Sequence, residues 1–142
     1  LEVLINKTFD TNIFFIEKNY ISKKIKYGWD SKNQEAYKNL NLLADFLLNN
    51  GVNQKKFSLF DFDKNDLPNI KFDVIISLYS LDYHYEFSLY KDYLKKIMKP
   101  ESVLIFDTIR PEYFNGIFKN VEIIKQDLNT VHKSKRIVCR NF

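Results

Sequence analysis

Short apolar runs alternate along this chain with segments in which apolar residues recur at helical spacing. Runs typical of strands lie at Ile13–Glu17, Phe57–Phe60, Phe72–Ser77 and Val103–Phe106. Between the first two runs, a helical pattern from Tyr37 to Leu48 ends at Asn50-Gly51. A second helix is predicted from Phe87 to Met98, because apolar residues recur there on one helical face. Lys99-Pro100 ends it, since the residue before a proline disfavours helix. Strands that alternate with helices predict an α/β fold with a mostly parallel sheet covered on both faces.

The two ends of the chain have their own patterns. Leu1–Asn6 is apolar and fits either the last turns of a helix or a short strand. Val121–Ile124 and Arg136–Cys139 read as two final strands with no helix between them, so we expect them to pair antiparallel. Ser31 or Asn33 is expected to cap the first long helix.

Composition narrows the class of protein. With 142 residues, the chain is expected to form one domain over 1–142. Its net charge of +4 is spread along the chain, which makes a nucleic-acid partner unlikely on these grounds. The single cysteine fits a reducing, cytoplasmic location, and no apolar run is long enough for a membrane span. Cys139 lies in an apolar strand and is expected to be packed rather than reactive.

Acids follow the first two predicted strands. Glu17 ends a strand, and a carboxylate there can accept hydrogen bonds from two vicinal ribose hydroxyls; a solvated strand-end acid is equally plausible. Asp61, Phe62 and Asp63 follow the next strand, where a carboxylate could accept from an adenine amino group and the ring could pack on the base. An Asx-turn that leads into the following Leu-Pro is the competing interpretation.

Polar groups also follow the next two strands. His84 lies near Asp82, and an imidazole oriented by a carboxylate is a candidate general base, although a histidine flanked by tyrosines is often structural. Asp107 ends the following strand and could orient the base or bind substrate. Because ligands bind at the carboxyl ends of parallel strands, these residues are expected to share one edge of the sheet. The spacing of His, Cys and acids indicates no metal site.

The order of these motifs resembles that of class I S-adenosylmethionine-dependent methyltransferases. Asn12–Glu17 is similar to that family's second strand, Phe57–Asp63 with Leu67-Pro68 to its third, and Phe72–Ser77 to its fourth. Tyr93–Pro100 looks like the helix and turn before the fifth. Ser80–Tyr85 resembles, more narrowly, a motif of bacterial sugar O-methyltransferases.

The resemblance implies a Rossmann-like methyltransferase sheet with an antiparallel strand near its C-terminal end. It implies that Glu17 binds the ribose, that Asp63 or Asp61 with Phe62 binds the adenine, and that Ser77 borders the S-adenosylmethionine. Asp63 keeps the family's spacing to Leu-Pro better than Asp61. Tyr20, Tyr27 and Trp29 are candidates for a lid or for core packing.

One feature departs from the family. The glycine-rich loop that holds the methionine part of the cofactor has no counterpart, since the only glycines are Gly28, Gly51 and Gly116. We therefore expect either that the first strand and its loop precede Leu1, so that the domain is N-terminally incomplete, or that LEVLI replaces that strand. The first alternative is favoured.

The leading interpretation is an O-methyltransferase that acts on a small-molecule or sugar hydroxyl, with S-adenosylmethionine as cofactor. His84 is the expected base, and Asp82 and Asp107 orient it or bind substrate. The alternative is a degenerate methyltransferase-like module that binds a protein or nucleic acid without catalysis; the absent loop and the Lys pairs favour it.

Overall fold

The computed structural model describes residues 1–17, 40–62, 64, 67–82, 86–126 and 133–142. The chain divides into two compact units, Leu1–Pro68 and Asn69–Phe142.

The first unit contains two helices and a parallel pair of strands. Its elements are α1 (Glu2–Phe9), β1 (Ile13–Glu17), α2 (Leu40–Asn49), the short 3-10 helix η1 (Gln54–Lys56) and β2 (Phe57–Asp61). β1 pairs with β2 in parallel, from Ile13 opposite Phe57 to Glu17 opposite Asp61. The LEVLI segment is helical from Glu2 onward, so of its two alternatives the helix is confirmed and the replacement strand is wrong.

The predicted stop of the first long helix is confirmed. Gly51 has a φ of 81°, and its amide donates to the carbonyl of Leu48, 2.9 Å away. The amide of Val52 donates to the carbonyl of Leu47 at 3.0 Å. A glycine at this position avoids the steric penalty that a side chain meets in the left-handed region. The predicted N-terminal caps, Ser31 and Asn33, lie outside the described residues.

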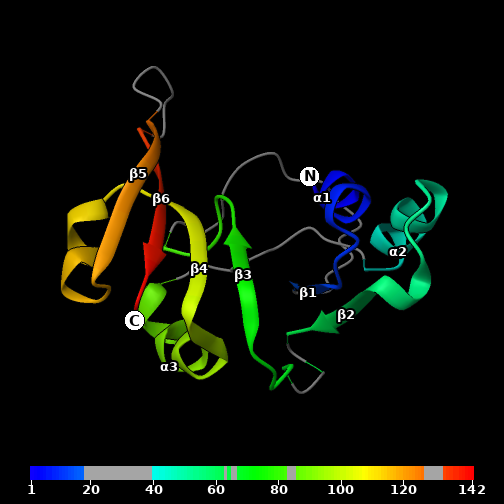
Figure 1. The fold of residues 1–142 in the computed structure, drawn as a ribbon, viewed down its shortest axis with the longest axis horizontal. Helices are drawn as coiled ribbons and strands as arrows, with labels where there is room; N and C mark the ends of the chain where they lie inside the picture. The colour runs from blue at the N-terminus through cyan, green and yellow to red at the C-terminus, as the bar shows by residue number, and fades with distance from the viewer. Residues whose placement is uncertain (18–39, 63, 65–66, 83–85, 127–132) are drawn as a thin grey trace, which may run out of the picture. The chain divides into compact units, whose positions relative to one another are not determined.

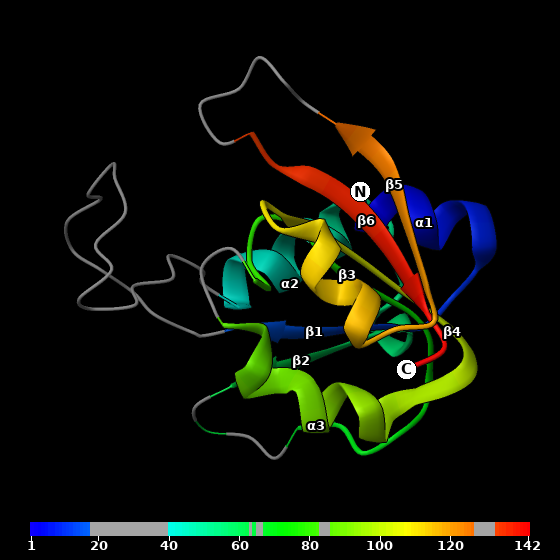
Figure 2. The same cartoon turned by 90° about the vertical axis from the view of Figure 1, so that its left-hand side faces the viewer.

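The second unit is a four-stranded mixed sheet with a helix on it (Figure 1). Its elements are β3 (Phe72–Ser77), α3 (Phe87–Ile97), β4 (Met98–Thr108), the 3-10 helix η2 (Pro111–Gly116), β5 (Asn120–Gln126) and β6 (Lys135–Arg140). The strands lie in the order β3–β4–β6–β5. The β3–β4 pair is parallel, whereas β4–β6 and β5–β6 are antiparallel. Figure 2 shows β5 and β6 side by side, so the predicted antiparallel pairing of the last two strands is confirmed.

The core of the second unit lies between α3, η2 and one face of the sheet. Phe87 at the start of α3, Phe106 on β4 and Phe114 in η2 are fully buried, and their ring centroids lie 4.8–6.0 Å apart. Leu94 and Ile97, about two and three turns further along α3, belong to the same cluster. The helical spacing read from the sequence therefore corresponds to the face of α3 that packs on the sheet.

The predicted Rossmann-like, mostly parallel sheet is wrong. The described residues contain six strands in two sheets, one parallel pair and one four-stranded mixed sheet in which only β3–β4 is parallel. A parallel neighbour needs a long crossover, commonly a helix. After β4 only the short helix η2 intervenes, so the chain continues into a β5–β6 hairpin, and β6 returns antiparallel beside β4.

Candidate functional site

Polar residues gather at the carboxyl ends of the parallel strands in each unit. In the first unit they follow β1 and β2, and in the second they follow β3 and β4. Parallel pairing explains this, because the strands of a parallel pair end at the same edge.

Glu17 and Asp61 meet at the carboxyl edge of the first unit. They are register partners at the ends of β1 and β2, and the amide of Phe62 donates to the carbonyl of Glu17 at 2.9 Å. The Asp61 side chain is 7% exposed, and its Oδ2 lies 3.5 Å from Nζ of Lys64. The Phe62 side of this edge is open, since that residue is 40% exposed. The structure thus brings three of the predicted cofactor-binding residues together.

Ser77 ends β3 and holds the loop that follows it. Its Oγ accepts a hydrogen bond from the amide of Leu81 at 3.0 Å. Leu81 is buried in the core of the second unit. Ser77 therefore shapes the first turn after the strand, which is a role that the sequence interpretation did not include.

Asp107 near the end of β4 is buried and paired with an arginine. Arg136 on β6 donates from Nε to Oδ1 at 3.0 Å and from Nη2 to Oδ2 at 3.1 Å, which is the two-bond geometry of a guanidinium on a carboxylate. The two residues are register partners across the antiparallel β4–β6 pair. Oδ2 of Asp107 also accepts from the amide of Tyr79 at 3.1 Å. Asp107 therefore links three segments of the second unit.

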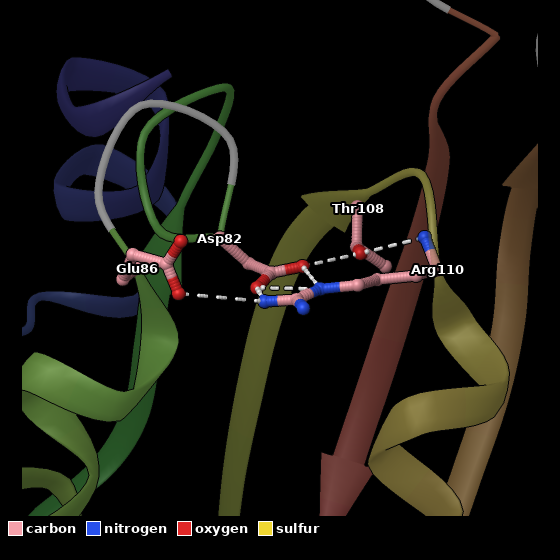
Figure 3. A network of polar contacts seen from close by, with 4 residues as sticks. All are labelled: Asp82, Glu86, Thr108 and Arg110. Atoms are coloured by element: carbon pink, nitrogen blue, oxygen red, sulfur yellow. Dashed lines mark hydrogen bonds and ion pairs between the residues drawn. The ribbon is translucent and has the colours of Figure 1, made fainter.

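Asp82 is the centre of a second network, drawn in Figure 3. Its side chain is fully buried, and Thr108 at the end of β4 donates from Oγ1 to its Oδ2 at 2.6 Å. Arg110 donates from Nη2 to Oδ1 at 2.6 Å and from Nε at 3.2 Å, while the Thr108 hydroxyl accepts the Arg110 amide at 3.0 Å. The hydrogen bond to Asp82 raises the pKa of the Arg110 guanidinium, which stays charged.

Arg110 has two further neighbours. Its Nη2 lies 4.0 Å from a carboxylate oxygen of Glu86, the residue that precedes α3. Its guanidinium carbon lies 4.5 Å from the centre of the Tyr113 ring, within the range of a cation–π contact. The side chain of Arg110 is nevertheless 45% exposed. It connects the end of β4 to Asp82 and to Glu86, the residue before α3.

Several predicted residues fall outside the described part of the chain. Asp63 and His84 are among them, as are the predicted lid residues Tyr20, Tyr27 and Trp29. Their predicted roles stay predictions. Among the described residues, no group of three or more His, Cys, Asp or Glu side chains could hold a metal ion.

Sequence reasoning missed Thr108, Arg110 and Arg136. All three bind the two acids that it did identify, Asp82 and Asp107. A signal was available for two of them, since Thr108 and Arg110 lie one and three residues after Asp107, near the strand end where parallel strands place functional groups. Arg136 had no such signal, because its contact depends on the register between β4 and β6.

Cys139 is buried in the core of the second unit, as predicted. Burial raises the pKa of its thiol from 9.0 to about 12. The thiol therefore stays protonated at neutral pH and is a poor nucleophile.

In comparison with known proteins, no family model matches this chain and no curated protein matches it. The interpretation of its function therefore depends on the motifs and on the geometry described above. Within the part of the chain that the structure describes, no helix has the length and apolar character needed to cross a membrane.

Proposed function

We propose that this chain acts in S-adenosylmethionine-dependent methylation of a hydroxyl group. The observation that carries the proposal is the pairing of Glu17 with Asp61 at the carboxyl end of a parallel strand pair. A fold of the Rossmann type is not part of the proposal.

The chemistry of this edge suits an adenosine group. A carboxylate can accept from the two vicinal hydroxyls of a ribose, which is the role proposed for Glu17. Asp61 is suited to accept from the exocyclic amine of adenine, and the partly exposed ring of Phe62 is suited to pack on the base. Lys64, whose Nζ lies 3.5 Å from Oδ2 of Asp61, is a counterion of that carboxylate.

The transfer itself needs an acceptor, a leaving group and a base. In the proposed reaction, the acceptor oxygen attacks the methyl carbon in line, the carbon–sulfur bond breaks, and S-adenosylhomocysteine leaves with the electron pair. The proton of the acceptor hydroxyl goes to a general base, for which His84 remains the predicted residue. Asp82 and Asp107 are both ion-paired, which supports an orienting role for them rather than that of the base.

Calorimetric titration with S-adenosylmethionine tests the proposal. We expect wild-type protein to bind, and Glu17→Gln and Asp61→Asn each to weaken binding roughly 10- to 100-fold, the cost of one charge-assisted hydrogen bond. Glu122→Gln is a matched control, because Glu122 is an exposed acid on β5 whose partner is Arg140. The proposal fails if the wild-type protein binds no S-adenosylmethionine or if the Glu17 and Asp61 variants bind it as well as the control.

The competing function is a binding module without catalysis. Its support is that the acids at the end of the second unit's strands are occupied by Arg110 and Arg136. A binding module would bind a protein or a nucleic acid but would not bind S-adenosylmethionine. If the partner is a nucleic acid, the affinity falls steeply with salt. A small-molecule or sugar acceptor and a cytoplasmic location complete the proposed function.

A further inference from the structure

We draw no further inference here: the strongest candidate, the apolar face that β3 and β4 of the four-stranded sheet turn away from α3, where Val74 is 52% and Ile76 39% exposed, carries no proposal because nothing in the structure shows what covers it.

Discussion

Replacing Arg136 with glutamine removes the cation from a carboxylate that the fold keeps away from water. Burial and hydrogen bonding of the pair determine how much stability this change costs. Asp107 is 3% exposed and Arg136 21% exposed, and the pair has two short hydrogen bonds. Removing one partner of a buried pair leaves an uncompensated charge and costs about 3–5 kcal/mol.

Replacing Asp107, the partner of Arg136, is expected to cost less stability than replacing Arg136. In Asp107→Asn, the amide oxygen can still accept from the Tyr79 amide, and the partly exposed Arg136 can be hydrated. We therefore expect a cost of about 1–2 kcal/mol, that of losing a charged hydrogen bond. The double variant carries no uncompensated charge and is expected to cost little more than Asp107→Asn alone. The two changes should thus be non-additive by about 2 kcal/mol or more.

The wild type, the two single variants and the double variant form a double-mutant cycle. Urea unfolding followed by circular dichroism measures the free energy of unfolding of all four proteins. A second cycle on Asp73 and Lys99 is the control, since Asp73 is 81% exposed and its pair is expected to contribute less than about 1 kcal/mol. A cost below about 1 kcal/mol for Arg136→Gln, or additive effects in the double variant, would refute the reasoning.

Three further outcomes are expected from the fold. Phe87→Ala removes a fully buried ring from the aromatic cluster and should cost about 3–5 kcal/mol of unfolding free energy in urea titrations, whereas a loss under 1 kcal/mol would contradict the described core. Gly51→Ala places a side chain at a φ of 81° and should destabilise by about 1–2 kcal/mol, while Gly116→Ala, at a glycine without a positive φ, should cost less. Cys139, with its thiol pKa raised to about 12, should stay protonated in the native state as the pH rises past 9. A thiol reagent at pH 9 should therefore react with it only after unfolding. Fast reaction of the native protein would contradict this prediction.

The raised thiol pKa also fixes a direction for stability against pH. Cys139 of the unfolded chain loses its proton near its ordinary pKa of 9.0, whereas the native protein keeps it until about 12. Its contribution is therefore fully present below pH 9 and is lost as the pH rises from 9 towards 12. Comparing wild type with Cys139→Ala over this range isolates the effect.

The positions of most strands and helices were predictable because they depend on local patterns. The apolar runs at Ile13–Glu17 and Phe72–Ser77 match β1 and β3 at both ends. α3 begins at Phe87 as predicted, and the chain leaves the helix at Met98, two residues before Pro100. β4 is longer than its apolar run, because it begins at Met98 and includes the polar residues before Val103.

For the candidate site, the sequence predicted the acids but not the arginines that pair with two of them. Glu17 and Asp61 were named from their places after strands, and parallel pairing does bring them to one edge. Asp82 and Asp107 were named for the same reason, but their arginine partners were not. Asp82 and Arg110 are 28 residues apart, and Asp107 and Arg136 are 29 apart, so no short motif carries either pairing.

The sequence by itself determined where the elements lie, which helix face is apolar and which acids stand at strand ends, since side-chain periodicity and backbone stops act within a few residues. Only the tertiary structure decided that the strands form two sheets, that β6 returns antiparallel beside β4, and that Asp82 and Asp107 each meet an arginine. Those outcomes depend on strand register and on contacts between distant segments, whose free energy is realised only when the chain has folded.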